Sequence, residues 1–188
     1  RRSGISNSSA PLGAIGRPKV ESGRDTLTSI NPECHVLPIA ERLAGDRLDA
    51  EVAAADIVLD CSDNFATRHA INRACVGHAK PLVSGAAIRF DGQVAVFDSR
   101  RDHAPCYNCL FPEGGDVEEV RCAVMGVFAP LTGIIGSTQA AEALKLLIGC
   151  GEPLAGRLLL LDGLAMDWRS IAVPRDPACP VCSASGRA

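Results

Sequence analysis

The pattern of hydrophobic and polar positions predicts alternating helices and strands in the first part of the chain. A helical stripe begins at Pro18, a favoured first helical residue, and ends before Asn31-Pro32; its apolar face carries Val20, Gly23, Leu27 and Ile30. We expect this helix to pack that face on a core. A short strand at 35–39 and a short helix at 43–54 follow.

Two short apolar runs without alternation, Ile57–Leu59 and Pro81–Val83, are typical of buried parallel strands. Between them lies a helix that Asp63 or Asn64 caps and that reaches about His78. The order is helix, strand, helix, strand, helix, strand. It predicts an α/β fold built on a doubly wound, Rossmann-like, mostly parallel sheet.

The second part of the chain predicts an antiparallel extension of this sheet. Strand-like runs at 88–90 and 93–97 flank Asp91-Gly92, which is a strong hairpin signal. Beyond them the pattern predicts a long loop at 98–123, an apolar helix that ends at about Ile148, and two strands at 157–161 and 166–173. A loop of that length is usually functional or fastened by another group.

Composition and charge exclude several classes of function. The 188 residues are 47% hydrophobic, and we expect one domain at 17–188 after an irregular arm at 1–16. A net charge of −3 and 4% aromatic residues supply neither the basic surface nor the stacking side chains that bind nucleic acid. No apolar run reaches the roughly 20 residues of a membrane span. We therefore expect a cytoplasmic protein without a nucleic acid or membrane partner.

Two CxxC pairs are the most specific local signal. The nine cysteines are an odd number, which argues against a secreted disulfide framework and for reduced thiols. Cys106 and Cys109 form one pair, and Cys179 and Cys182 form the other. Two such turns supply the four thiolates of a closed, tetrahedral Zn2+ site. The alternatives are a redox motif or incidental thiols, but a redox motif would not need a second copy.

A second candidate site follows the strand at 57–59. The carboxyl end of a parallel strand is where ligands bind in open α/β sheets, and a carboxylate there can hold Mg2+ on a nucleotide phosphate. Asp63 is that carboxylate and Asn64 is its neighbour. From spacing alone, a role as helix N-cap remains open for both residues.

Two further residues have one functional and one plain interpretation each. Lys19 lies one residue inside a helix start, where a cation opposes the helix dipole unless an anion such as phosphate is near; a solvated lysine is the alternative. Cys122 follows Arg121 directly before the apolar helix, and both features lower a thiol pKa. We consider Cys122 a candidate nucleophile, with a buried structural thiol as the alternative.

A set of motifs follows in order along most of the chain: Gly16–Val20, Ile30–Pro32, Leu59–Asn64 with Arg68, Pro81–Ala86, Gly92-Gln93, Cys106–Cys109, Ala129–Leu131, Gly136-Ser137 and Cys179–Cys182. Together they resemble the ThiF/MoeB/HesA family, the bacterial relatives of ubiquitin-activating enzymes. Leu110–Pro112, Asp162-Gly163 and Trp168–Ser170 are more similar to the sulfur-carrier activators than to the larger eukaryotic enzymes.

The resemblance implies a function. Family members use ATP to adenylate the C-terminal glycine of a small ubiquitin-like sulfur carrier of the ThiS or MoaD type, and a separate protein supplies the sulfur. By this resemblance Lys19 contacts phosphate, while Asp63, Asn64 and Arg68 hold Mg2+ and nucleotide. Cys122 matches a cysteine that links covalently to the carrier in some members. The resemblance also implies a homodimer.

The resemblance has one large departure. The family's first strand, its glycine-rich ATP loop, its ribose-binding acidic residue and an arginine donated across the dimer all precede the point that matches Arg1. We therefore expect an amino-terminally incomplete member. The alternative function is a non-catalytic, zinc-clipped carrier-binding domain or an inactive fragment.

Overall fold

The computed structural model describes residues 16–114 and 126–183, and these divide between Leu43 and Ala44 into two units. The smaller unit contains α1 (Lys19–Ile30), which begins after Pro18 and ends before Asn31 as predicted. Residues 34–40 form no regular element, so the predicted strand at 35–39 is wrong. Val20, Leu27 and Ile30 are exposed, and the expected packing of α1 on a core is not seen within its own unit.

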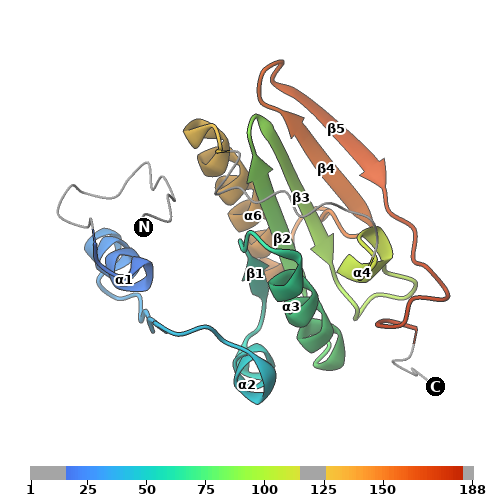
Figure 1. The fold of residues 1–188 in the computed structure, drawn as a ribbon, viewed down its shortest axis with the longest axis horizontal. Coiled ribbons are helices and arrows are strands. Elements are labelled where there is room, and N and C mark those ends of the chain that lie inside the picture. The colour runs from blue at the N-terminus through green and yellow to red at the C-terminus, as the bar shows by residue number, and fades with distance from the viewer. Residues whose placement is uncertain (1–15, 115–125, 184–188) are drawn as a thin grey trace. The chain divides into compact units, whose positions relative to one another are not determined.

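The larger unit is built on a five-stranded mixed sheet (Figure 1). The strands follow one another in chain order: β1 (Val58–Asp60), β2 (Leu82–Ile88), β3 (Asp91–Phe97), β4 (Arg157–Asp162) and β5 (Asp167–Ala172). β1 and β2 are parallel, whereas the other three neighbouring pairs are antiparallel. The α/β class and the antiparallel extension are confirmed. Among the described strands, however, the antiparallel part is the larger one.

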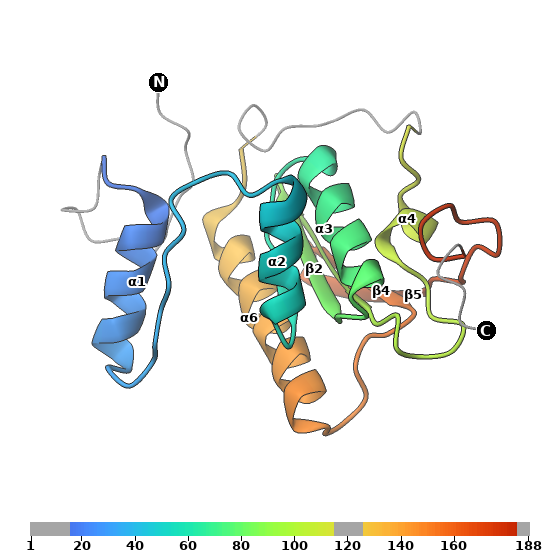
Figure 2. The same cartoon turned by 90° about the horizontal axis from the view of Figure 1, so that it is seen from below.

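Helices cover both faces of the sheet, as a doubly wound fold requires (Figures 1 and 2). The long α6 (Ala129–Ile148) packs against β2 and β3 on one face. The other face is covered by three helices: α2 (Gly45–Ala54), α3 (Phe65–Gly77) and the short α4 (Tyr107–Leu110). The helix α4 lies within the segment 98–123 that the sequence predicted as loop. None of the described helices has the length and hydropathy needed to cross a membrane.

The two apolar cores follow from the alternation of side chains along the central strands. Leu82 on β2 and Phe97 on β3 pack with α2, α3 and α4. Their neighbours Val83 and Val96 point to the opposite face and pack with α6. Because β2 buries side chains on both faces, its start reads as a continuous apolar run and was recognisable in the sequence. In β1, by contrast, Leu59 is exposed.

The hairpin between β2 and β3 turns two residues earlier than predicted. Ile88 pairs with Asp91, so the turn residues are Arg89 and Phe90, and Arg89 has a left-handed φ of 49°. Gly92 lies inside β3, where an added Cβ would come within 2.6 Å of Ile135 on α6. The glycine that signalled a turn is thus needed for close packing of α6 on the sheet.

Candidate functional site

The loop between β1 and α3 holds the predicted nucleotide-site residues. β1 ends at Asp60, and α3 begins at Phe65. The Asn64 side chain caps α3, because its Oδ1 accepts a hydrogen bond of 2.9 Å from the Thr67 N–H. The N-cap role therefore falls to Asn64, and the carboxylate of Asp63 is exposed beside it, with Asn64 Nδ2 3.4 Å from Asp63 Oδ1.

Arg68 holds this loop from the α3 side. The side chain is buried, and its guanidinium donates to the Ser62 carbonyl oxygen, to Ser84 Oγ at 3.0 Å and to the Gly85 carbonyl oxygen at 3.0 Å. It also lies 3.5 Å from Asp60 Oδ2. In the structure the Arg68 side chain therefore fastens the loop that presents Asp63, and its contact with a nucleotide stays a prediction.

Asp60 fixes the same loop from within. The carboxylate is 1% exposed, and its Oδ1 accepts hydrogen bonds from the Ser62 N–H at 2.9 Å and from Ser62 Oγ at 2.6 Å. A buried carboxylate is stable only when it is paired and hydrogen-bonded, and Arg68 with Ser62 meets both conditions.

Gln139 holds the loop from the opposite face of the sheet. This buried α6 residue donates from Nε2 to the carbonyl oxygens of Asp60 at 3.0 Å and Val83 at 3.2 Å. Its Oε1 lies 3.5 Å from Cys61 Sγ. Gly85 leaves room for it, since a Cβ on Gly85 would come within 2.2 Å of the Gln139 amide. No sequence motif predicted a site role for Asp60 or Gln139; the only local signal was the position of Asp60 at a strand end.

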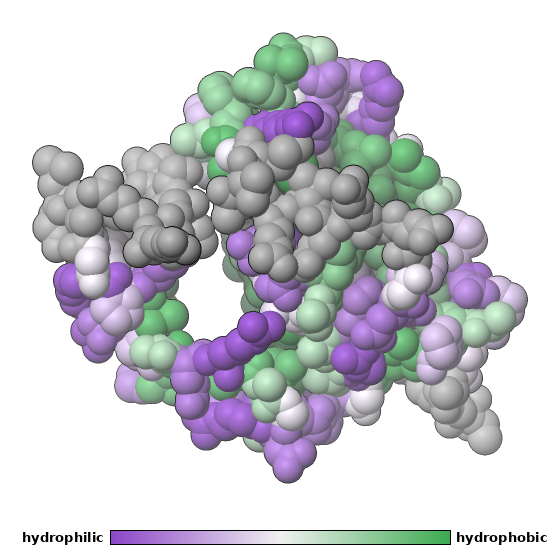
Figure 3. Space-filling model, viewed as in Figure 1, coloured by the Kyte–Doolittle hydropathy of each residue, from purple (hydrophilic) through white to green (hydrophobic). Residues whose placement is uncertain are grey.

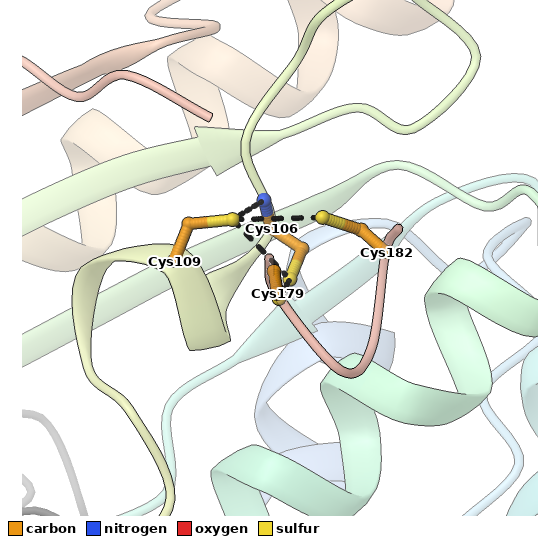
Figure 4. Close-up of side chains that lie close together, drawn as sticks. All are labelled: Cys106, Cys109, Cys179 and Cys182. Atoms are coloured by element: carbon orange, nitrogen blue, oxygen red, sulfur yellow. Dashed lines mark hydrogen bonds between the residues drawn. The ribbon is translucent and has the colours of Figure 1, made fainter. Parts of the chain in front are cut away.

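The four predicted cysteine ligands meet in the folded chain (Figure 4). All four Sγ atoms lie within 4.8 Å of one another. Cys106 Sγ is 3.7 Å from Cys179 Sγ, and Cys109 Sγ is 3.5 Å from Cys182 Sγ. Tetrahedral Zn–S bonds of about 2.3 Å place sulfur atoms about 3.8 Å apart, so the donor set and its spacing fit Zn2+.

Local structure explains how each pair is presented. Cys106 is the N-cap of α4, and its backbone N–H points to Cys109 Sγ at 3.5 Å. The second pair lies on a turn after β5, where the Cys179 N–H donates to the Asp176 carbonyl oxygen at 3.1 Å. The two turns come from segments 73 residues apart, so the site joins distant parts of the larger unit.

The thiols of the cluster differ in acidity. Burial raises the pKa of Cys106, and burial together with Cys109 raises that of Cys182 to about 11. Burial also acts to raise the pKa of Cys179, but the N–H groups of Cys182 and Val181 and the Asn108 amide outweigh it, and the pKa falls to about 7. Hydrogen-bond donors around Cys179 thus stabilise a thiolate, the form that binds metal.

Lys19 and Cys122 complete the set of predicted site residues. Lys19 is exposed at the first position of α1 and belongs to the smaller unit, whereas Asp63 belongs to the larger one. Cys122 lies outside the described residues. No disulfide joins any two of the eight cysteines that the structure describes.

Comparisons with known proteins agree with this architecture. The ThiF family model matches residues 8–181. The molybdopterin-synthase adenylyltransferase of Escherichia coli is 45% identical over 168 residues, covering 89% of this chain and 67% of that protein. The ThiS adenylyltransferase of the same organism is 43% identical over 171 residues, covering 91% of this chain and 67% of that protein. The sulfur carrier protein adenylyltransferase of Thermus thermophilus is 45% identical, covering 89% of this chain and 64% of that protein.

The chain therefore spans about two thirds of the length of these curated relatives. Among solved structures, E. coli MccB with ATP has the same fold, with a TM-score of 0.75 at 21% identity, over 92% of this chain and 53% of that one. The ordered motifs, the family match over most of the chain and these relatives agree, and the chain belongs to the ThiF family.

Proposed function

We propose that this protein acts in the ATP-dependent adenylation of the C-terminal glycine of a small ubiquitin-like sulfur carrier. The observation that carries the proposal is the β1–α3 loop, which presents the exposed Asp63 carboxylate at the carboxyl end of β1 while Asp60, Arg68 and Gln139 hold the loop backbone. The names of the relatives, which are adenylyltransferases of molybdopterin synthase and of sulfur carriers, support the reaction type.

The reaction needs an attacking carboxylate, ATP and a leaving pyrophosphate. The carrier's terminal carboxylate oxygen attacks the α-phosphorus, the bond to the β-phosphate bridging oxygen breaks, and an acyl-adenylate forms. Asp63 would hold Mg2+, which neutralises phosphate charge when bound. Lys19 would add a positive charge near the departing pyrophosphate.

The outer strands offer a surface for a protein substrate. Apolar residues lie at the tip of the β4–β5 hairpin (Figure 3), where Leu164 and Met166 are exposed. On β5, Ile171 is exposed on the face that carries α3, and Trp168 is exposed on the face that carries α6. Among the described strands, β5 lies at one edge of the sheet. Exposed apolar patches on an edge strand are typical of protein-binding surfaces. We place the body of the carrier there, and we expect one structural Zn2+ in the four-sulfur site.

The proposal is tested by carrier-dependent exchange of pyrophosphate into ATP, with protein expressed from the complete gene. Asp63→Asn should slow exchange by about 100-fold or more, since it removes the carboxylate that we propose holds Mg2+ at the reacting phosphates. Asp56→Asn is the matched control, because Asp56 is an exposed carboxylate that precedes the amino end of β1. Equal exchange by both variants would refute the role of Asp63.

The non-catalytic carrier-binding domain is the less favoured alternative, because the relatives carry the names of enzymes. A protein that captures the carrier but shows no exchange at any ATP concentration would favour it. The choice between thiamine and molybdopterin carriers follows from exchange rates with a ThiS-type and a MoaD-type carrier.

A further inference from the structure

Two buried asparagines lie against the four-sulfur site. Asn72 on α3 is 1% exposed, and Asn108 on α4 is 4% exposed. Asn72 Nδ2 is 3.6 Å from Cys106 Sγ, and Asn108 Nδ2 is 3.4 Å from Cys179 Sγ. Each CxxC pair therefore has one sulfur within donor range of a side-chain amide.

The orientation of both amides is fixed by the backbone. Asn72 Oδ1 accepts a 2.9 Å hydrogen bond from the Tyr107 N–H, and Asn108 Oδ1 accepts one of 3.1 Å from the Glu113 N–H. Exchanging oxygen and nitrogen would direct an NH2 group at a backbone N–H and an oxygen lone pair at sulfur. Only the orientation in which each NH2 group donates to sulfur satisfies both backbone N–H groups and both sulfur atoms.

We infer that Asn72 and Asn108 are positioning residues of the metal centre and that Asn72 fastens α3 to it. Four thiolates around one Zn2+ carry a net negative charge in a buried site, and amide donors to sulfur offset that charge. α3 is also the helix whose N-terminus follows Asp63, so its third turn is tied to the metal ligands while its first turn borders the proposed nucleotide site. This inference rests on the proposed Zn2+ site.

The test is Asn72→Asp in the protein from the complete gene. The aspartate keeps the oxygen that accepts the Tyr107 N–H, loses the donor to Cys106 and adds negative charge. We expect Zn2+ affinity, measured by competition with a chromophoric chelator, to fall by about 10- to 100-fold. The thiolate-to-metal charge-transfer band of the Co2+ form should shift. Asn108→Asp applies the same change to the second cysteine pair and should also lower the affinity for Zn2+.

Asn31→Asp is the matched control. Asn31 is exposed, its Oδ1 accepts a 3.0 Å hydrogen bond from the Glu33 N–H, and it belongs to the smaller unit. Its substitution brings the same change in charge and should leave Zn2+ affinity unchanged. Wild-type affinity in both Asn72→Asp and Asn108→Asp would overturn the inference.

A measurement on the unmodified protein covers the case in which a variant does not fold. In the 113Cd-substituted protein, the side-chain amide protons of Asn72 and Asn108 should show scalar coupling to cadmium through the sulfur atoms. Absence of coupling at both asparagines in a fully loaded site would overturn the inference while leaving the metal site intact. A wild-type protein that binds far less than one metal ion per chain would instead refute the metal site itself.

Discussion

His69 differs from the polar side chains that hold the β1–α3 loop. It is 4% exposed on α3, and its Nδ1 has no hydrogen-bond partner in the part of the chain that the structure describes. Its ring packs edge-on against Tyr107 and near Phe65. Burial lowers the pKa of this imidazole below its usual 6.5, so the folded protein holds His69 neutral.

We predict that this histidine makes stability depend on pH. Because its pKa is lower in the folded than in the unfolded state, its contribution is fully present above about pH 6.5 and is lost as the pH falls through the folded-state pKa. His69→Phe keeps the ring and should flatten the decline in unfolding free energy between pH 7.5 and 5, measured by urea titration. The exposed His35→Phe serves as control. An unchanged decline in His69→Phe would contradict this prediction.

How far single residues could be predicted depended on the range of their contacts. The clustering of the four cysteines was predictable because each CxxC pair defines a local turn that can present two thiols to one metal. The position of Asp63 after β1 was predictable from the apolar run before it, while its role stays a prediction. Gln139 was not, because its partner Asp60 is 79 residues away and nothing near Gln139 distinguishes it from other polar residues of α6.

Between elements, Gly85 of β2 and Gln139 of α6 form a close packing contact. We predict that Gly85→Ala destabilises the protein by about 1 to 3 kcal/mol, because the new methyl group displaces the Gln139 amide from its two carbonyl acceptors. Chemical denaturation measures the loss. Combined with Gln139→Ala, the change should cost less than the sum of the single changes, since the clash is then absent.

The control for Gly85→Ala is Gly77→Ala. Gly77 ends α3, and its added Cβ would meet nothing within 4 Å, so alanine there should be neutral or slightly stabilising. A Gly85→Ala protein as stable as Gly77→Ala would show that Gln139 adapts without cost.

Elements with strong local signals were predicted well, and the errors have physical causes. α3, α6, β4 and β5 lie close to their predicted ranges, because caps and apolar periodicity are properties of contiguous residues. The hairpin turn was misplaced since Asp91-Gly92 has two possible uses, a turn or close packing, and only the position of Ile135 decides between them. The strand at 35–39 was wrong because a short apolar run becomes a strand only when another strand pairs with it.

Across the whole chain, the 188 residues contain no GxGxxG or GxxxxGK[ST] sequence. Backbone N–H groups of a glycine-rich loop approach phosphates more closely than one lysine and one aspartate can. We predict that this chain alone binds ATP several powers of ten more weakly than a version extended upstream by a glycine-rich loop, at about 1.5 to 3 kcal/mol for each missing charged hydrogen bond. Carrier-dependent pyrophosphate exchange compares the two. Equal exchange would place the nucleotide site elsewhere.

Cys122→Ser tests the remaining candidate. We predict that it abolishes any covalent adduct with the carrier, detected by mass spectrometry, while pyrophosphate exchange continues, since adenylation precedes thiol attack. Loss of both would make Cys122 a structural residue.

The spacing of the two cysteine pairs has a consequence for chain entropy. A metal that joins Cys106 to Cys179, 73 residues apart, closes a loop that contains α6, β4 and β5. If a metal crosslink restricts the unfolded chain as a disulfide does, closure of such a loop stabilises the folded protein against unfolding by about 4 kcal/mol. Removal of the metal should therefore raise amide hydrogen exchange in α6 and in the β4–β5 hairpin, although the cysteines themselves lie on α4 and on the turn after β5.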